Sequence, residues 1–188
     1  MLTRHGWLAA LFGLGGLLSH AQSGATEYTL DPARTVVVFE MRSMGALQHG
    51  EFSRAAGTVV MDAADESGEL DIVIDASSLT AGSEAMAKFV RGPSMLDTGA
   101  HPEIAYRAAR IVFSHGKPSR IDGELTLLGV TRPVPLQISD YVCERARCSI
   151  AASASLKRSA FGMTRYRLFA SDDVQLAIRA EGVRREPE

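Results

Sequence analysis

The chain has 188 residues, a formal net charge of −2 and a hydrophobic fraction of 46%. This length is enough for one domain with a buried core. The mildly acidic charge and the lack of a basic stripe exclude nucleic acid as an expected partner. No apolar run reaches the eighteen residues that a membrane-spanning helix needs.

The first twenty-one residues have the pattern of a secretory signal peptide. Arg4 and His5 form a short positive region, and residues 7–18 are an apolar run. A membrane anchor is the alternative, but this run contains three glycines and is too short for a hydrocarbon core of about 30 Å. Ala21 ends a segment with small residues where a signal peptidase needs them. We expect cleavage after Ala21, export to the periplasm, and one mature domain over residues 22–188.

Beyond this segment, the dominant hydrophobic period is two. Apolar and polar residues alternate in short runs separated by polar turns, which indicates antiparallel strands with one buried and one solvated face. Around eight such strands predict an all-β fold, either a closed barrel or a sandwich. The runs cover residues 35–41, 57–61, 70–75, 104–108, 121–128, 134–138, 150–156 and 174–180.

Residues 83–91 break this period and predict a single helix. Ser83 can cap the first turn, and Gly92 followed by proline ends the helix. Helical spacing places three apolar residues on one side, which we expect to cover a barrel mouth. These residues are Met86, Phe89 and Val90.

The face assigned to the barrel interior has side chains of uneven size. A barrel of about eight strands either fills its interior with side chains or holds one small ligand. Small interior residues can line a cavity, or they can accommodate large neighbours in a packed core, and the pattern alone supports both interpretations. The small residues are Ala108, Gly123, Ala152 and Ala154, and the large ones are Phe39, Met41 and Tyr106.

Cys143 and Cys148 are the only cysteines of the chain. Their spacing is neither the C-x-x-C of a redox motif nor half of a paired zinc site. In an oxidising periplasm, two cysteines that flank a short turn predict a cross-strand disulfide, and two free thiols are the alternative. Because the closed loop is short, we expect local stapling of the hairpin and little added stability.

Four segments resemble sequence signatures of the YceI family. Residues 123–136, GELTLLGVTRPVPL, are similar to its motif G-x-L-T-L-x-G-V-T-x-P-V-x-L, and residues 158–163, RSAFGM, to its motif R-S-x-F-G-[LM]. Residues 28–33 resemble the opening Y-x-[LI]-D-P strand, and residues 101–104 the [YH]-P-x-[IM] segment. The resemblance runs in order from about residue 28 to residue 181, so it covers nearly the whole expected mature chain.

This resemblance implies an elongated, lipocalin-like antiparallel barrel of about eight strands with one inserted helix. Members of the family are associated with binding polyisoprenoids, isoprenoid quinones or other long-chain amphiphiles in the lumen, which favours a cavity over a packed core. The implied ligand is a long-chain isoprenoid or fatty lipid, with no cofactor and no metal. We expect the lumen and mouth to be lined by Phe39, Met41, Phe52, Met86, Phe89, Val90, Met95, Leu96, Tyr106, Leu125, Leu136, Ala152, Ala154 and Phe161.

The chain departs from the family pattern at several polar positions. Residues 86–90, Met-Ala-Lys-Phe-Val, stand where the family often has R-D-x-H-L. Leu128 occupies a position that often holds histidine, and Ala160 one that often holds aspartate. Any contacts that those polar groups make to a ligand head group in relatives are therefore made differently here.

Basic and aromatic residues interleave over residues 157–169. One interpretation is a mouth at which Arg158 and Arg165 bind an anionic head group. The other is a solvated hairpin end, which is the commoner setting for such a charge pattern. Asp172 and Asp173 could bind a cation, but a turn before the last strand explains them better.

No motif for catalysis is present in the sequence. It lacks G-x-S-x-G, H-E-x-x-H and a glycine-rich phosphate loop, and the histidines at positions 49, 101 and 115 read as solvated loop residues. Two non-enzymatic function classes remain. One is a periplasmic carrier of a long apolar lipid. The other is an accessory protein with a filled barrel whose surface contacts a membrane partner such as a membrane cytochrome. The oligomeric state stays open in both.

Overall fold

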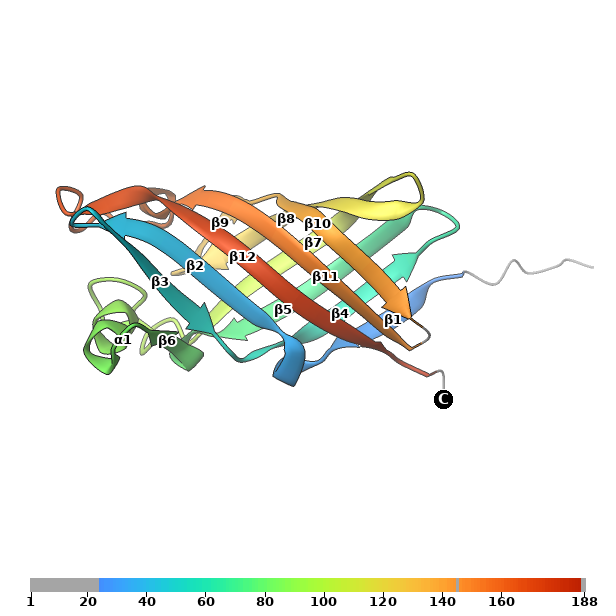
Figure 1. Ribbon diagram of the computed structural model, residues 1–188, viewed down its shortest axis with the longest axis horizontal. Coiled ribbons are helices and arrows are strands. Elements are labelled where there is room, and N and C mark those ends of the chain that lie inside the picture. The colour runs from blue at the N-terminus through green and yellow to red at the C-terminus, as the bar shows by residue number, and fades with distance from the viewer. Residues whose placement is uncertain (1–23, 145, 187–188) are drawn as a thin grey trace, which may run out of the picture.

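The computed structural model describes residues 24–144 and 146–186, which form one twelve-stranded antiparallel sheet with a helix at one end (Figure 1). The helices are α1 (Glu84–Arg91) and three short 3-10 segments, η1 (Pro32–Arg34), η2 (Ala76–Ser78) and η3 (Arg158–Phe161). The strands are β1 (Thr26–Leu30), β2 (Val36–Ser43), β3 (Ala46–Phe52), β4 (Ala55–Asp62), β5 (Ser67–Asp75), β6 (Leu79–Ala81), β7 (Glu103–Ser114), β8 (Lys117–Leu127), β9 (Val130–Pro133), β10 (Leu136–Glu144), β11 (Arg147–Lys157) and β12 (Ala170–Arg184).

Eight of these strands close into a barrel in the order β1-β4-β5-β7-β8-β10-β11-β12, because β12 returns to pair with β1. The last strand, β12, has 15 residues and uses one edge for two partners. This edge pairs with β1 near Val183 and with β2 along most of the rest of the strand. Strands β3 and β6 continue the wall beyond β2. The lumen therefore extends past the closed ring toward α1.

The two ends of the elongated barrel differ. One end, which we call the mouth end, is formed by the turn between β2 and β3, by α1, and by residues 164–169 before β12 (Figure 1). The opposite end contains the β10–β11 hairpin, and Cys148 lies beside Gly182 there. We call it the disulfide end. No helix among the residues described is long and apolar enough to cross a bilayer.

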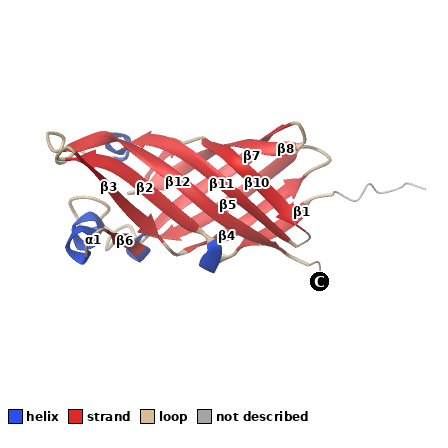
Figure 2. Ribbon diagram, viewed as in Figure 1, coloured by secondary structure: helices blue, strands red, loops and turns tan. Residues whose placement is uncertain are grey.

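The predicted all-β fold, a closed barrel of eight strands with one inserted helix, is confirmed (Figure 2). The helix prediction is confirmed as well, with Ser83 as its N-cap. Strands β3, β6 and β9 were not predicted. Strand β3 buries only Gly50 and Phe52, and the other two have three and four residues. Their hydrophobic alternation is therefore too weak or too short to recognise in the sequence.

Alternation positions the core. In β8, residues Ile121, Gly123, Leu125 and Leu127 are buried, while the residues between them are partly or fully exposed. The same pattern on the other long strands gives one hydrophobic cluster that runs inside the barrel. Burial of this surface stabilises the fold by about 25 cal/mol per Å² of apolar area removed from water.

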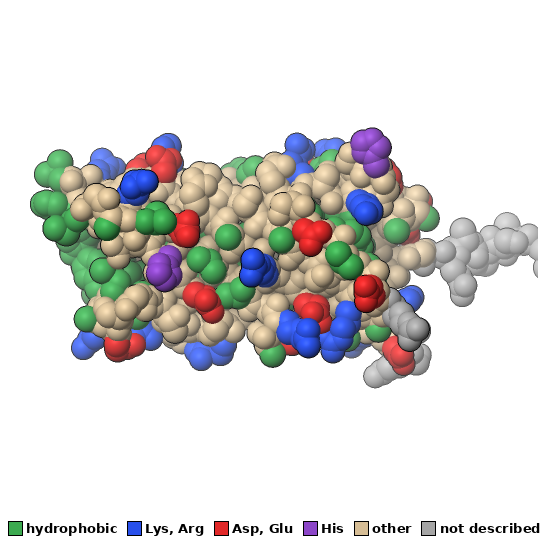
Figure 3. Space-filling view, in the orientation of Figure 1, with side chains coloured by type: hydrophobic (Ala, Val, Ile, Leu, Met, Phe, Trp, Pro, Cys, Tyr) green, Lys and Arg blue, Asp and Glu red, His purple; other side chains and the backbone are tan. Residues whose placement is uncertain are grey.

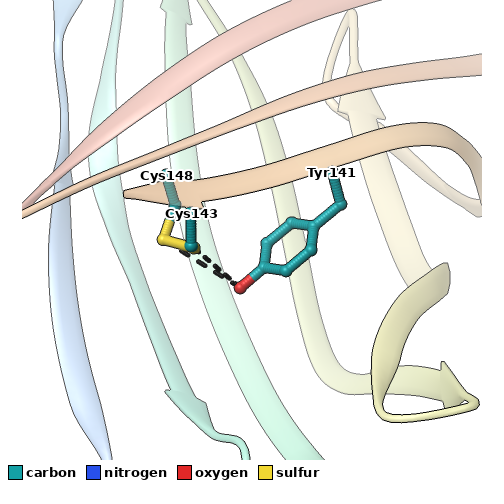
Figure 4. Close-up of a disulfide and its surroundings, with 3 residues drawn as sticks. All are labelled: Tyr141, Cys143 and Cys148. Carbon is teal, nitrogen blue, oxygen red and sulfur yellow. Dashed lines mark hydrogen bonds between the residues drawn. A yellow bond between two sulfur atoms is a disulfide. The ribbon is translucent and has the colours of Figure 1, made fainter. Parts of the chain in front are cut away.

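Cys143 and Cys148 form a disulfide between directly opposite residues of the β10–β11 hairpin. The Tyr141 hydroxyl lies 2.8 Å from Sγ of Cys143, and because a disulfide sulfur has no proton, the hydroxyl is the donor (Figure 4). Burial raises the pKa of Tyr141, which keeps this hydroxyl protonated. The bridge therefore fixes the end of a hairpin that strand pairing already defines.

Replacing both cysteines with serine should lower the free energy of unfolding by about 2 kcal/mol or less. The bridged residues are five apart in sequence, and the chain-entropy relation gives about 2 kcal/mol for so short a loop. Thermal unfolding with and without reductant tests this, and reductant should not affect the double variant. Two titratable thiols in the unreduced, denatured protein would contradict the bridge.

Candidate ligand-binding site

The barrel encloses an apolar cavity of about 100 Å³ toward the mouth end. We call it the inner cavity. Every residue that lines it is apolar except Arg158. Residues from β2, β3, β5, β7, β8, β11 and β12, from α1, and from the segments after α1 and η3 contribute to the lining. They are Val37, Phe39, Met41, Phe52, Ile74, Val90, Met95, Leu96, Ile104, Leu125, Leu127, Leu156, Arg158, Met163, Val174 and Leu176.

A second, wider cavity of about 460 Å³ lies at the mouth end, and we call it the mouth cavity. It shares four lining residues with the inner cavity, so the two are neighbours along one path into the barrel. Its outer lining mixes apolar side chains with a few polar ones. The shared residues are Phe39, Met41, Val90 and Met95, and the others are Ser43, Met44, Gln48, His49, Ala81, Met86, Phe89, Tyr166, Phe169 and Ala170.

Helix α1 positions the side chains between the two cavities. The Ser83 hydroxyl accepts a hydrogen bond from the backbone N–H of Met86 at 3.2 Å, which satisfies one free donor of the first turn. Ala87 is 1% exposed and seats the helix on the barrel. Val90, one turn along the same side, therefore faces the lumen, and the ring of Phe89 lies 5.4 Å from that of Tyr166 across the mouth.

The inner cavity ends at a filled layer in the middle of the barrel. Along β12, Leu176 lines the inner cavity and Ala180 a small third cavity of about 60 Å³ toward the disulfide end, whereas Ile178 lies between them and lines neither. Along β5 and β7, Ile72 and Tyr106 are opposite each other at the same level. The layer between the cavities thus contains Tyr106 as its bulkiest side chain.

Tyr106 is held firmly in this layer. Its hydroxyl donates to the carbonyl of Val134 at 2.8 Å, and its ring packs on Gly123, where a Cβ atom would lie 2.5 Å from the ring. Only glycine permits this close approach. Burial is the main cause that raises the pKa of Tyr106, so the group stays a neutral donor.

The structure brings nine of the fourteen predicted lumen residues together at the inner or mouth cavity and places five elsewhere. Those at the cavities are Phe39, Met41, Phe52, Met86, Phe89, Val90, Met95, Leu96 and Leu125. Arg158, predicted as a head-group residue, also lines the inner cavity. The predicted residues Tyr106, Leu136, Ala152, Ala154 and Phe161 are buried but line none of the three barrel cavities.

Of the two interpretations of the small interior residues, accommodation of large neighbours describes the middle of the barrel better than a cavity does. Ala152 and Ala154 are buried at the level between the inner and third cavities, and Gly123 is small because the ring of Tyr106 lies on it. The space therefore lies nearer the mouth, among large flexible side chains. Large and small residues interdigitate in the middle layer, as they do in packed cores.

Arg158 has a structural role that the sequence did not indicate. Its side chain is 1% exposed, and its guanidinium donates four hydrogen bonds to backbone carbonyls, two in the segment before β12 and two at the first residues of β12. An arginine has five N–H donors, so little capacity is left for a ligand head group. The acceptors are the carbonyls of Met163, Arg165, Ala170 and Ser171.

Other residues of the 158–163 motif, together with Asp172 in β12, support the same segment before β12. The Asp172 carboxylate accepts from both the backbone N–H and the hydroxyl of Ser159, at 2.8 and 2.7 Å. These hydrogen bonds hold the pKa of Asp172 below its usual value. Phe161 is 1% exposed, and Gly162 ends η3 in the left-handed region with φ of 87°. Asp172 and Asp173 lie near the start of β12, so the expected turn before the last strand was wrong for these two residues. The described residues contain no cluster suited to a metal ion.

Arg165 is the basic residue of this segment that remains available at the mouth. It is exposed, and its only side-chain hydrogen bond within the described chain is a 3.4 Å contact with Ser94. His49 lies in β3 and lines the mouth cavity, whereas the sequence placed it in a loop. Met86 and Phe89, which stand where the family resemblance implied polar residues, are apolar parts of the mouth lining.

Sequence reasoning missed half of the inner cavity lining. All of the missed residues except Met163, which follows η3, were already on the predicted inward faces, so following each face to the helix end of its strand would have found them. Only the tertiary structure shows which end of each strand faces the helix. The missed residues are Val37, Ile74, Ile104, Leu127, Leu156, Met163, Val174 and Leu176.

An eight-stranded antiparallel barrel with an apolar lumen beneath a helix defines a lipocalin-like barrel. A family model described as the YceI-like domain matches residues 28–182. This chain therefore belongs to the YceI family.

Known relatives and solved structures agree with this assignment. A UPF0312 protein of Pectobacterium atrosepticum is 28% identical, with 95% of this chain and 97% of the relative covered. A UPF0312 protein of Pseudomonas aeruginosa is 26% identical, with 94% and 97% covered.

Two solved structures share the fold at lower identity. BcnA of Burkholderia cenocepacia has a TM-score of 0.69 at 22% identity, with 81% of this chain and 98% of BcnA covered. A domain of Saccharophagus degradans has a TM-score of 0.67 at 15% identity, with 84% and 98% covered. The latter is described as a polyisoprenoid binding domain implicated in plant cell wall breakdown.

Proposed function

We propose that this protein is a periplasmic binding or carrier protein for a long-chain polyisoprenoid, an isoprenoid quinone or a similar amphiphilic lipid, without catalytic activity. The observation that supports this most directly is the pair of neighbouring apolar cavities that lead from the mouth into the barrel. The description of a structural neighbour as a polyisoprenoid binding domain supports the same ligand class. The signal-like segment and the disulfide support export.

The lining indicates how such a lipid would lie. An apolar chain in the inner cavity needs no polar partner, and the one polar lining residue, Arg158, is already bonded to backbone carbonyls. A polar head group would lose hydrogen bonds to water there. We therefore place the chain inward and the head group at the mouth, near His49, Gln48 and Arg165.

The cavity volumes set how far a chain can enter. The inner cavity, at about 100 Å³, is smaller than the roughly 150 Å³ cavity that holds a benzene molecule, while the mouth cavity is in the usual range for small-molecule sites. Deep insertion requires side chains to move. Met41, Met95 and Met163 line the inner cavity, and methionine adapts its shape more readily than other apolar residues.

A surface-acting accessory protein is the second candidate, and the filled layer around Tyr106 favours it. In that reading the barrel is a scaffold, and the cavities near the mouth are packing defects. Lipid content separates the two functions. Mass spectrometry of organic extracts from natively purified protein should detect a long-chain lipid if the barrel is a carrier.

Replacing Val90 with tryptophan should lower the affinity for a fluorescent polyprenol about tenfold or more. Val90 lines both cavities from α1, so a larger ring there occupies the space that the chain needs. Ala85 on the same helix is exposed and lines neither cavity, so Ala85→Trp is the matched control. Binding is measured by titration at equal circular dichroism.

Equal affinities of Val90→Trp, Ala85→Trp and the parent would place the ligand outside these cavities. A parent that binds neither a polyprenol nor a long-chain quinone, and carries no lipid after native purification, would overturn the carrier function.

A further inference from the structure

In the part of the chain that the structure describes, large exposed apolar side chains are concentrated at one end of the barrel. Among the described residues, eight large hydrophobic side chains are exposed, and seven of them are at the mouth end (Figure 3, left). The eighth, Val142, lies in the β10–β11 hairpin at the disulfide end. The seven are Met44, Leu47, Met86, Phe89, Tyr166, Leu168 and Phe169. We call them the apolar rim.

Three separate segments of the chain build the apolar rim into one surface. The backbone N–H of Met44 donates to the carbonyl of Phe169 at 2.7 Å, which joins the β2–β3 turn to the loop before β12. The Phe89 and Tyr166 rings, 5.4 Å apart, join that loop to α1. Five of the seven residues also line the mouth cavity. The rim therefore surrounds the opening through which the proposed lipid would pass.

Folding does not require these side chains to be apolar. Met44 is 83% exposed at the tip of a tight turn with φ of 51°, a position that asparagine or aspartate usually fills. Leu168 is 93% exposed and lines no cavity. Contiguous exposed apolar surface of this kind marks an interaction site.

The charge around the rim is opposite to that of the whole chain. The three rim segments, residues 42–47, 84–91 and 164–169, contain five cationic side chains and one acidic one, although the whole chain has a net charge of −2. The acidic residue, Glu84, is paired with Arg91. The cationic residues are Arg42, Lys88, Arg91, Arg165 and Arg167.

We propose that the apolar rim docks on an anionic phospholipid bilayer, with Leu168, Met44 and Leu47 in the interfacial region and the cationic residues at the head groups. Apolar side chains flanked by Lys and Arg are the pattern of proteins that lie on a membrane surface. Docking in this orientation turns the mouth cavity toward the hydrocarbon. A lipid could then slide into the barrel without exposing its chain to water, so the inference rests on the proposed carrier function.

A second copy of the chain fits this surface less well. In a symmetric dimer the same patch meets itself, so the cationic side chains around the rim of one copy would lie close to those of the other. Like charges opposed across an interface are unfavourable. Anionic lipid head groups, in contrast, compensate the positive charge on every side of the rim.

Co-sedimentation with phosphatidylglycerol–phosphatidylethanolamine vesicles tests the proposal, with the chain from residue 22 onward, which contains every strand of the closed barrel. Replacing both Leu47 and Leu168 with glutamate should reduce vesicle binding about tenfold or more, because each buried leucine is equivalent to at least one decade of affinity. Val142→Glu is the matched control and should bind as the parent does. Neither leucine lines a cavity, so polyprenol binding in detergent should be unchanged.

The electrostatic contribution to vesicle binding can be tested separately. Binding should weaken on vesicles of phosphatidylcholine alone, and also when salt rises from about 0.1 M to about 1 M, which shortens the Debye length from about 10 Å to about 3 Å. Equal vesicle binding by the double variant and Val142→Glu would overturn the docking surface. So would a parent that binds the polyprenol but no vesicles, or a dimer that the leucine changes dissociate. Loss of polyprenol binding in the parent would instead refute the carrier function.

Discussion

Replacing Arg158 with methionine should lower the free energy of unfolding by about 3–5 kcal/mol, a large effect for one residue. Methionine fills much of the same space but donates no hydrogen bond, so four backbone carbonyls lose their partner at once. Each buried polar group left without a partner costs about 1–3 kcal/mol. The total loss of stability is smaller than four such costs, because loop movement lets some of the carbonyls bond to water. In a protein of this size the melting temperature should fall by about 10 °C or more.

Arg165→Met is the matched control for this change. Arg165 is exposed and only seven residues away, so its replacement should alter the melting temperature by little. Arg158→Lys should behave more like Arg158→Met, because a single ammonium cannot reach carbonyls on several sides of the loop. Thermal unfolding of the three variants measures this. Equal stabilities of Arg158→Met and Arg165→Met would show that the carbonyl contacts do not hold the loop.

Replacing Tyr106 with alanine should shift the bound lipids toward longer chains. Tyr106 is the bulkiest side chain of the layer between the inner cavity and the cavity at the disulfide end. Its removal would join the two spaces, so the barrel could accept more of a chain. The same change should cost about 3–5 kcal/mol of stability, as aromatic-to-alanine changes in cores do. Competition between a short and a long polyprenol, with mass spectrometry of the bound fraction, measures the shift.

Tyr106→Phe separates the size of the ring from its hydroxyl. This variant loses the hydrogen bond to the Val134 carbonyl, which should cost about 1 kcal/mol, but it keeps the ring on Gly123 and the parent's preference for chain length. Tyr106→Leu offers a smaller change if the alanine variant does not fold. Unchanged chain-length preference in folded variants with a smaller side chain would show that the ligand ends before this layer or that the layer already opens in solution.

The residues changed in these predictions lie along one path from the apolar rim into the barrel. The apolar rim surrounds the mouth cavity, Val90 and Met95 stand between the mouth and inner cavities, and Tyr106 ends the inner cavity. Arg158 shapes the loop that contributes Tyr166 and Phe169 to the rim. A change at each level should therefore affect a different measurement: membrane binding, affinity, chain length or stability.

The sequence by itself determined most of the strands and the helix of this protein, whereas alternation alone left both a closed barrel and a sandwich open. Period-two alternation predicts antiparallel strands because successive side chains of a strand point to opposite faces. The helix over residues 83–91 and the pairing of Cys143 with Cys148 depend on local signals of the same kind, a serine cap and a short turn. The two motifs of residues 123–136 and 158–163 were enough to indicate the family.

The tertiary structure decided where the cavities lie and which functions the motif residues have. Alternation shows that Ala154 and Leu156 face inward, but only the closure of the barrel places Leu156 at the cavity and Ala154 in the filled layer. The sequence left Arg158 open between an anion-binding residue and a solvated residue at a hairpin end, and the structure shows it buried and bonded to backbone carbonyls. The apolar rim comes from three segments far apart in the chain. Position along the barrel axis depends on strand register and on contacts between distant segments, and neither leaves a local pattern in the sequence.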